Sequence, residues 1–279
     1  MRMTTWLITG CSAGLGRSLA QAVLKAGFNV VVTARNPDSV ADIVSAYPKT
    51  AVAAALDVTD RQAIDRVVAL AGERFGGIDV LVNNAGYGYR AAVEEGDEEE
   101  VAALFATNVF GPVSVIKAVL PGMRERKTGT IVNISSIAAQ RSSPGSGFYS
   151  ATKRALEGLS DALRKEVAPL GIKVLIVEPG AFRTEFAGRS LRGSDKGLDA
   201  YATTAGPRRK GTDKTHGTQP GDPDLAAQVM MDTIMGGDLP VRLLLGRDAI
   251  AVVGEEIEAQ RAEIKAWSDV SVKTDFTNR

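Results

Sequence analysis

Cysteine and histidine are almost absent from this sequence, which contains one of each, Cys11 and His216. A single cysteine excludes an intramolecular disulfide, and one histidine with one cysteine cannot build a His/Cys zinc site. An excess of charge of one sign is also lacking, because 33 basic side chains balance 33 acidic ones. Without a net charge, the chain has no global field to attract nucleic acid or an anionic membrane.

Long apolar runs are missing as well, and no apolar stretch approaches the ~20 residues that a membrane-spanning helix needs. The first residues lead directly into a predicted strand, without the apolar core and cleavage site of a signal peptide. We therefore expect a soluble, cytoplasmic protein that binds neither nucleic acid nor membrane. The 279 residues, of which 44% are apolar, allow one large α/β domain or two small ones.

Short apolar runs alternate with longer amphipathic ones along most of the chain. The short runs are rich in β-branched residues, as expected of strands covered on both faces, and they are Trp6–Thr9, Asn29–Ala34, Ala51–Leu56, Val80–Val82, Thr130–Ile134 and Val174–Val177. The longer runs have helical spacing and are Leu15–Lys25, Arg61–Arg74, Val109–Arg126 and Tyr149–Val167. This alternation predicts a single Rossmann-type, doubly wound α/β domain over residues 1–279, with about seven parallel strands and helices on both faces.

Local signals support the helices and separate them from one long polar segment. Asp60 is placed to cap the helix predicted from Arg61, and the acidic run Glu94–Glu100 suits the positive end of the next helix, where we interpret it as a solvated first turn. Between Phe186 and Asp224, glycines and prolines interrupt the pattern. Segments of this kind are usually functional lids or disordered, so we expect residues 186–224 to form a substrate loop.

The polar segment also contains His216 and the basic triplet Arg208-Arg209-Lys210, both of which we interpret as surface residues. Residues 225–279 follow it and predict the C-terminal helices and a last strand. The helices are expected near Leu225–Met235 and Ala249–Trp267, and the strand at Val241–Leu245.

A glycine-rich turn follows the first predicted strand and opens the first predicted helix, and it reads Thr9-Gly10-Cys11-Ser12-Ala13-Gly14-Leu15-Gly16. Glycines there allow a tight turn and a close approach of the backbone to a ligand. The free N–H groups of the helix favour an anion. Together with the flanking strands, the turn indicates a dinucleotide site. No Gly-Lys-Ser/Thr follows, which excludes a Walker loop.

The end of the second predicted strand should meet the adenosine ribose. A site selective for NAD usually has a carboxylate there, whereas this sequence has Ala34 and Arg35, with Arg17 just past the glycine loop. Two guanidinium groups without an acid suit a 2′-phosphate. We therefore expect NADP(H) to be preferred over NAD(H). The alternative is that both arginines are ordinary surface charges.

Tyr149 and Lys153 lie four residues apart in one predicted helix, which puts them on the same face, one turn apart. A free tyrosine has a pKa of about 10 and is a poor acid–base catalyst at neutral pH. An ammonium about 5 Å away, at an effective dielectric of ~20, contributes about 3 kcal/mol and lowers that pKa by roughly two units. We expect this pair to exchange a proton with a substrate.

These motifs and several others make the chain resemble the classical short-chain dehydrogenase/reductases from Thr5 to about Phe186. The glycine loop matches the family's T-G-x-x-x-G-x-G pattern, and Asn83-Asn84-Ala85-Gly86 matches its N-N-A-G motif. Ser136 lies thirteen residues before Tyr149, at the family's spacing for its catalytic serine. Further matches are Asp57, Asn108 and the segment Pro179-Gly180 with Thr184. Three shorter stretches, at Trp6–Ser12, Ala34–Pro37 and Arg242–Gly246, resemble the 17β-hydroxysteroid/retinol-dehydrogenase-like branch.

The resemblance implies a role for each matched residue. Tyr149 would exchange the proton with the substrate oxygen, and Lys153 would lower its pKa and bind the nicotinamide ribose. Ser136 would hydrogen-bond the carbonyl or carbinol, and Asn108 would hold a water linking Lys153 to solvent. The implied cofactor contacts are Gly10, Ser12, Gly14, Leu15, Gly16, Arg17, Arg35, Asp57, Val58, Asn84, Ala85, Gly86, Tyr149, Lys153, Pro179, Gly180 and Thr184.

We therefore expect an NADP(H)-dependent enzyme that interconverts a carbonyl and an alcohol, with a homodimer or homotetramer as its assembly. The substrate pocket should lie at the carboxyl ends of the strands. Its expected lining lies near Ile137, Ser143, Phe148 and Phe182. Two alternatives stay open: a dehydratase or epimerase on the same scaffold, and a non-catalytic NADP(H) sensor or scaffold. The sensor predicts tight cofactor binding without turnover of any carbonyl.

Overall fold

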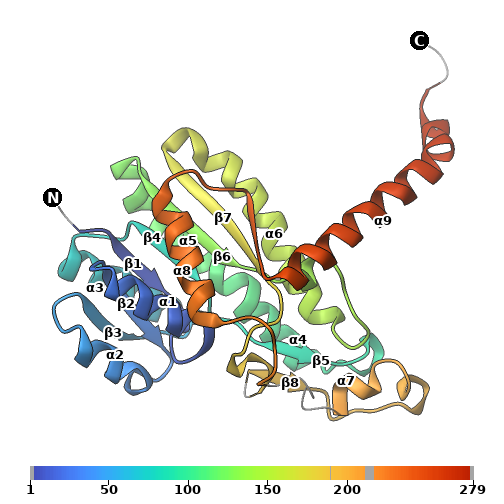
Figure 1. The fold of residues 1–279 in the computed structure, drawn as a ribbon, viewed down its shortest axis with the longest axis horizontal. Helices are drawn as coiled ribbons and strands as arrows, with labels where there is room; N and C mark the ends of the chain where they lie inside the picture. Colours follow the sequence, from blue (N-terminus) through green and yellow to red (C-terminus); the bar gives the residue numbers. More distant parts are fainter. Residues whose placement is uncertain (1–2, 189, 211–216, 277–279) are drawn as a thin grey trace.

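The protein is built around one parallel sheet with helices packed on it in the computed structural model, which describes residues 3–188, 190–210 and 217–276 (Figure 1). The strand order is β3-β2-β1-β4-β6-β7-β9, and every neighbouring pair is parallel. The strands are β1 (Thr5–Ile8), β2 (Asn29–Ala34), β3 (Ala51–Ala55), β4 (Val80–Asn83), β6 (Gly129–Ile134), β7 (Ile172–Pro179) and β9 (Arg242–Leu245). The predicted doubly wound fold is confirmed.

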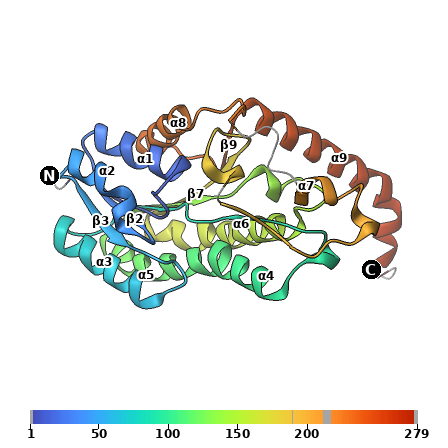
Figure 2. The same cartoon turned by 90° about the horizontal axis from the view of Figure 1, so that it is seen from below.

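Helices cover both faces of this sheet (Figure 2). One face carries α1 (Gly14–Lys25), α2 (Ala41–Ala46) and α8 (Pro223–Gly236). The other carries α3 (Arg61–Phe75), α5 (Gly111–Arg126) and α6 (Gly147–Val167), with α4 (Glu98–Phe105) beside α6. Because the central strands are buried on both sides, their apolar residues run without alternation, and the sequence signal for these strands was strong.

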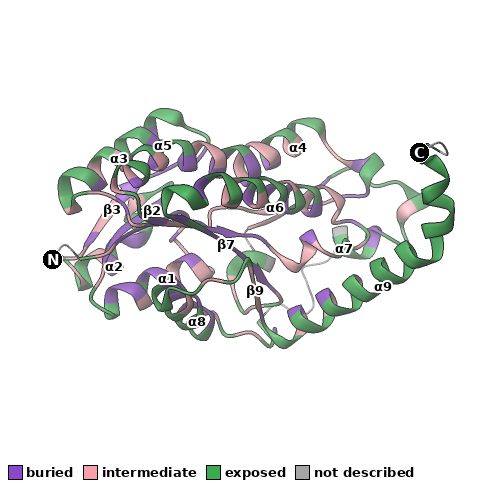
Figure 3. Cartoon of the chain, turned by 90° about the horizontal axis from the view of Figure 1, so that it is seen from above, coloured by how far each residue is buried: buried purple, intermediate pink, exposed green. Residues whose placement is uncertain are grey.

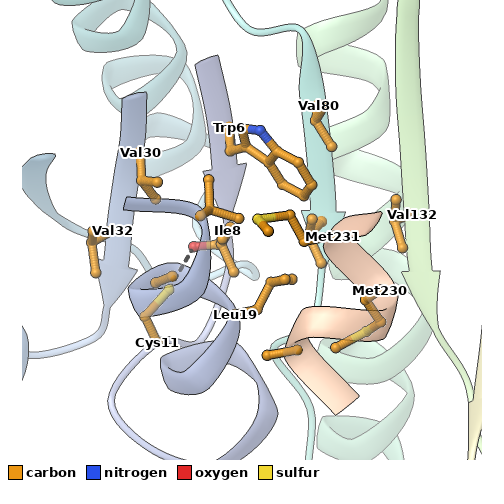
Figure 4. Close-up of a cluster of buried hydrophobic side chains, with 14 of the residues drawn as sticks. Trp6, Ile8, Cys11, Leu19, Val30, Val32, Val80, Val132, Met230 and Met231 are labelled. Atoms are coloured by element: carbon orange, nitrogen blue, oxygen red, sulfur yellow. Dashed lines mark hydrogen bonds between the residues drawn. The ribbon is translucent and has the colours of Figure 1, made fainter. Parts of the chain in front are cut away.

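The core beneath α1 and α8 is made of large apolar side chains (Figure 4). Trp6 and Ile8 of β1 pack with Leu19 of α1 and Met230 of α8, and all four are completely or almost completely buried. Cys11 belongs to the same cluster and donates a hydrogen bond to the carbonyl of Ile8. Burial raises the pKa of its thiol to about 12, so Cys11 acts as a packing residue.

The strand order reverses between β1 and β4, and this reversal positions the site. From β1 the chain moves outward through β2 and β3, then returns to place β4 on the other side of β1. In open α/β sheets a crevice forms where neighbouring connections leave in opposite directions. The glycine loop follows the end of β1, and Asn84 to Gly86 follow the end of β4, so the two motifs meet at this point.

Carboxylates at two helix starts act as the sequence predicted. Asp60 accepts hydrogen bonds from the backbone of Gln62 and Ala63 at the start of α3. Asp97, within the acidic run, caps α4 by accepting from the backbone of Glu99 and Glu100. Capping of this kind satisfies N–H groups that have no partner within the helix.

One member of the acidic run corrects the interpretation of that run as a solvated turn. Glu95 is completely buried, and its carboxylate accepts hydrogen bonds from the backbone N–H groups of Ala92 and Leu198. The backbone carbonyl of Glu95 also accepts a hydrogen bond from Ser194. Glu95 therefore fastens the polar segment 186–224 to the body of the protein.

The polar segment is more structured than the expected loop, and it contains β8 (Leu191–Gly193) and the short helix α7 (Gly206–Lys210). Strand β8 pairs in parallel with β5 (Gly88–Arg90), which lies outside the main sheet. Such short strands carry little apolar periodicity, so the sequence pattern did not predict them. Arg208 donates a hydrogen bond to Ser146, and His216 lies outside the described residues.

A continuous helical stretch from Glu98 to Arg126 joins α4, one π-helical turn at Ala106–Phe110, and α5. By length and composition it could cross a membrane, with a mean hydropathy of 1.6 over 18 residues, contrary to the expectation from apolar run length. It packs against α3 and α6 as a layer of the fold, and core helices of globular proteins meet the same criteria. The stretch is therefore weak evidence for a membrane span.

The last long helix, α9 (Arg247–Ser271), leaves the body and projects outward (Figure 1). Its first turns pack through the buried Ala249 and Val253. From Ile257 to Phe276 every residue is exposed, and the helix is almost uniformly so in Figure 3. The sequence predicted a helix at Ala249–Trp267 but not that its distal half would lie free of the body.

Candidate active site

A cleft of about 610 Å³ opens at the carboxyl ends of the central strands. Most of the residues that the sequence predicted for cofactor binding and catalysis line it, and they are Gly10, Ser12, Gly14, Leu15, Arg35, Asp57, Val58, Asn84, Ala85, Gly86, Ser136, Tyr149, Lys153, Pro179, Gly180 and Thr184. Three of the predicted residues, Gly16, Arg17 and Asn108, lie outside this lining. The structure therefore gathers residues spread over most of the chain into one place.

The glycine loop is locked to the loop after β4 by Thr9 and Asn84. The Thr9 hydroxyl accepts hydrogen bonds from the backbone of Asn84 and Ala85, both at 2.9 Å. The Asn84 amide donates back to the carbonyls of Thr9 and Gly10, at 2.8 and 3.0 Å. A side chain at Gly16 would come within 2.2 Å of the Asn84 amide, so Gly16 is required for this packing.

This cradle fits the pyrophosphate of a dinucleotide. Gly10 and Gly14 have φ angles of +73° and +59°, a conformation that side chains disfavour. The N-terminus of α1 at Gly14 points its unpaired N–H groups toward the cleft, where they favour an anion. Thr184 lies against Gly14, since a Cβ on that glycine would be 3.3 Å from the Cβ of Thr184.

The two arginines predicted to bind a 2′-phosphate occupy different places. Arg35 follows the buried Ala34 at the end of β2, is exposed, and lines the cleft. Arg17 forms an ion pair with Asp42 and lines a smaller neighbouring cavity. The residue directly after β2 is thus a base and not an acid. Of the two arginines, Arg35 is the one that faces the large cleft.

Ser136, Tyr149 and Lys153 converge at the floor of the cleft, from the end of β6 and the first turns of α6. Tyr149 lies close enough to Ser136 for the serine hydroxyl to affect its acidity. The Lys153 amine lies 5.7 Å from the centre of the Tyr149 ring and donates a 2.8 Å hydrogen bond to the carbonyl of Ile134. The helical spacing that the sequence predicted therefore puts both groups at one point, beside the serine.

The acid–base properties of this trio differ from the sequence expectation. Burial raises the pKa of Tyr149 to about 12, and the Ser136 hydroxyl opposes this rise. Burial lowers the pKa of Lys153 to about 8, and the negative charge of Glu157 opposes that fall. The expected lowering of the Tyr149 pKa is not found in the protein alone, because desolvation of the phenolate outweighs the opposing effect of Ser136.

Asn108 lies in the π-helical turn and supports the site from behind. Its amide nitrogen donates to the Tyr87 carbonyl at 2.8 Å and to the Thr152 hydroxyl at 3.2 Å. Its amide oxygen accepts from the Tyr87 backbone at 3.1 Å. A Cβ on Gly86 would be 3.1 Å from that oxygen. Asn108 therefore joins the loop after β4 to α6, the helix that carries Tyr149 and Lys153.

The expected substrate-pocket lining is only partly correct. Phe182 lines the cleft, but Ile137, Ser143 and Phe148 are not among the residues around it. Phe148 instead packs against Tyr89, with their ring centres 6.1 Å apart. The helical position before Tyr149 points away from the cleft, which the sequence pattern did not reveal.

Several residues of the site had no clear sequence signal. Phe186 places its ring 5.5 Å from that of Tyr149, and Arg192 lies 4.7 Å above the ring of Tyr87. Both Phe186 and Arg192 come from the polar segment. Glu157 is a site residue that the sequence could have revealed, because it lies four residues after Lys153 and so shares its helix face.

Comparison with known proteins identifies the family. The short chain dehydrogenase family matches residues 4–194, which is more than half of the chain, and the fold and cleft agree with that match. The chain belongs to the short chain dehydrogenase family and is an oxidoreductase.

Relatives resemble it over nearly their whole length. Oxidoreductase BOA17 of Botryotinia fuckeliana is 37% identical over 96% of this chain and 97% of its own. The crystal structure of a short-chain dehydrogenase from Streptomyces avermitilis is 47% identical and superposes with a TM-score of 0.90, covering 98% of this chain and 100% of that one.

Two more distant structures contain nicotinamide cofactors. The alcohol dehydrogenase of Thermococcus sibiricus, complexed with 5-hydroxy-NADP, is 25% identical with a TM-score of 0.71, over 87% of this chain and 96% of its own. The 3-ketoacyl-(acyl-carrier-protein) reductase of Brucella melitensis, complexed with NADH, is 25% identical with a TM-score of 0.70, over 86% of this chain and 96% of its own. Similar proteins thus bind either NADP or NAD.

Proposed function

We propose that this protein is an NADP(H)-dependent oxidoreductase that interconverts a ketone or aldehyde with an alcohol, using Tyr149 as acid and base. The observation that carries the proposal is the convergence of Ser136, Tyr149 and Lys153 at the floor of a cleft that also contains the glycine loop. A binding module would need the glycine loop but not this trio. Distant relatives with alcohol dehydrogenase and ketoacyl reductase activity support the same reaction type.

When bound, the cofactor supplies or accepts a hydride at the carbon of the carbon–oxygen bond. In the reducing direction, the Tyr149 hydroxyl gives its proton to the carbonyl oxygen as that oxygen gains negative charge. Ser136 donates a hydrogen bond to the same oxygen and orients it. The Lys153 ammonium stabilises the phenolate that remains on Tyr149. In the oxidising direction each proton moves the opposite way.

Support for NADP(H) rests on the end of β2. Arg35 is exposed at the rim of the cleft, where a guanidinium pairs well with a phosphate. Because Arg17 already forms an ion pair with Asp42, we expect the preference for NADP(H) over NAD(H) to depend on Arg35. The carboxylate of the neighbouring Asp57 accepts hydrogen bonds from the backbone N–H and the hydroxyl of Thr59. We therefore do not expect Asp57 to bind the ribose.

The test is a screen of ketones, aldehydes and alcohols that follows the absorbance of the reduced nicotinamide, with wild type beside Tyr149→Phe. Turnover in wild type that falls at least 100-fold in the variant is expected, since general acid–base catalysis contributes about 10²–10⁴-fold. Undiminished activity in Tyr149→Phe would remove the catalytic assignment. Tight NADPH binding with no turnover of any carbonyl would favour the sensor alternative. The cytoplasmic location and the lid role of residues 186–224 stay predictions.

We also propose that the chain assembles with a second copy of itself, through an apolar stripe on α9. The stripe consists of Ala249, Val253, Ile257, Ile264 and Trp267, which share one face at helical spacing. The body covers its first two members. The exposed fractions of Ile257, Ile264 and Trp267 are 55%, 72% and 60%, and exposed apolar patches of this kind mark interaction sites.

The edges of the α9 stripe favour a copy of the same chain as the partner. Glu256 and Glu263 flank the stripe on one side, and Arg261 and Lys265 flank it on the other. Two copies therefore offer each other an acidic edge and a basic edge, as flanking positions do in helix pairs. Light scattering of Ile257→Asp/Ile264→Asp should show a smaller assembly than wild type, while Ala262→Asp on the opposite face should not change it. A monomeric wild type would refute this assembly.

A further inference from the structure

A buried group of acidic side chains lies directly behind the candidate active site. Glu157 of α6 and Glu178 of β7 are 4% and 0% exposed. The Nε of Arg242, on β9, lies 3.2 Å from a carboxylate oxygen of each. The second carboxylate that Arg242 binds on α6 is that of Asp161, at 2.6 Å. Three carboxyl groups thus surround one guanidinium, which leaves negative charge uncompensated.

Glu157 is the member of this group that faces the active site. One carboxylate oxygen accepts a 2.6 Å hydrogen bond from the Ser135 hydroxyl, and the other accepts from the Gln140 amide at 3.0 Å. Ser135 directly follows Ile134, whose carbonyl accepts the hydrogen bond from the Lys153 amine. The same short piece of backbone therefore holds both Lys153 and Glu157, one helical turn apart.

Glu157 and Glu178 lie side by side and share two partners. The Gln140 amide donates hydrogen bonds to both carboxylates, at 3.0 and 3.2 Å, and the Nε of Arg242 contacts both. Burial and the charge of Glu157 together raise the pKa of Glu178 to about 7, while Gln140 and Arg242 oppose the rise. Glu178 therefore takes up a proton more readily than an ordinary carboxyl group.

We propose that Glu157 is a positioning residue that keeps the Lys153 amine protonated in its buried site, with Glu178 beside it on the same Gln140 and Arg242 contacts. Without a nearby anion, a buried lysine releases its proton readily. The titratable and charged groups that face the Lys153–Glu157 pair are Tyr149 and Asp161 on α6, Glu178 on β7 and Arg242 on β9. The proposal rests on the proposed function only for the role of Lys153 toward Tyr149.

A purely structural role is the competing explanation, because the same contacts join α6, β7 and β9. The two explanations differ in what they predict for Lys153. A structural crosslink, when removed, lowers the stability of the fold but leaves the protonation of a correctly folded Lys153 unchanged. An electrostatic partner, when removed, changes the pH at which Lys153 loses its proton.

The deciding measurement is a pH titration of Lys153 by NMR, in full-length protein with isotope-labelled lysine, its signal assigned by loss in Lys153→Arg. In Glu157→Gln the Lys153 pKa should fall by about one to two units, the size expected for one charge about 6 Å away at an effective dielectric of ~20. Asp161→Asn is the matched control, since it also removes a carboxylate from Arg242 but lies a further turn from Lys153. It should leave the titration near that of wild type.

An unchanged Lys153 titration in folded Glu157→Gln would overturn the proposal. If Glu157→Gln does not fold, Glu157→Asp keeps the charge at a changed distance, and the wild type offers a second readout. Its Lys153 signal should show a second inflection near pH 7, where Glu178 titrates, and Glu178→Gln should abolish that inflection. A single inflection in wild type would refute the electrostatic influence of this acidic group on Lys153.

These readouts need no substrate, so they remain decisive even if the carbonyl screen finds no activity. With a substrate in hand, the profile of kcat/KM against pH provides a further readout. The alkaline loss of activity should begin at lower pH in Glu157→Gln and at the wild-type pH in Asp161→Asn. Loss of activity with an unmoved profile would support the structural explanation instead.

Discussion

The ring of Phe186 lies 5.5 Å from the ring of Tyr149, tilted by 52°. Phe186 belongs to the polar segment that the sequence predicts as a substrate loop, and Tyr149 is the proposed acid and base. The first residue of the loop therefore packs against the ring that carries the proposed acid–base hydroxyl.

Removing this ring contact should weaken catalysis without abolishing it. Aromatic pairs contribute about 0.5–1.5 kcal/mol beyond burial, so Phe186→Ala should lower kcat/KM about 2- to 10-fold. Phe186→Tyr, which keeps the ring, should stay near wild type. Steady-state kinetics with the best substrate of the screen would measure both, and an unchanged kcat/KM in Phe186→Ala would show that the contact is incidental.

Cofactor preference should change with Arg35. A charge-assisted hydrogen bond to phosphate contributes about 1.5–3 kcal/mol, so Arg35→Glu should weaken NADPH binding about 10- to 100-fold and improve NADH binding relative to it. Arg17→Ala is the comparison variant, because Arg17 is paired with Asp42, and a smaller effect is expected from it. Fluorescence titrations with each reduced cofactor test this. Equal wild-type affinity for NADPH and NADH would refute the arginine argument.

The buried Lys153 amine should lower the stability of the fold, although the proposed function requires it. Because its folded pKa is about 8, below the usual 10.5, the unfolded chain holds this proton more tightly, and the charged amine is a net cost below pH 8. Lys153→Met should therefore be more stable than wild type at pH 7, by about 1–3 kcal/mol, while losing activity. The difference should shrink as pH rises from about 8 to 10.5. Urea unfolding at pH 7 and pH 10 measures it, and a less stable variant at pH 7 would contradict the prediction.

Glu95 should control how firmly the polar segment is held. Removing its buried carboxylate leaves the N–H groups of Ala92 and Leu198 without their acceptor, which costs about 2–3 kcal/mol. Glu95→Ala should therefore make the segment around residues 190–210 more sensitive to limited proteolysis. Glu98→Ala, which removes an exposed acid from the start of α4, is the control. Equal cleavage of both variants and wild type would show that other contacts hold the segment.

The sequence by itself determined the fold class and most of the site. Seven strand positions were readable because parallel strands buried on both faces are continuously apolar, as at Asn29–Ala34, which the structure reproduces residue for residue. The glycine loop and the Tyr149–Lys153 spacing were readable because turns and single helix faces are local properties of the chain.

Tertiary structure alone decided what depends on distant residues. No local pattern predicts the ring contact of Phe186 with Tyr149 or that of Phe148 with Tyr89. The ion pair between Arg17 and Asp42 was equally unpredictable. The clearest case is acidity, where a one-turn spacing predicted a lowered Tyr149 pKa and burial raised it to about 12. Desolvation is the sum over everything packed around a group, and only the folded chain determines what is packed there.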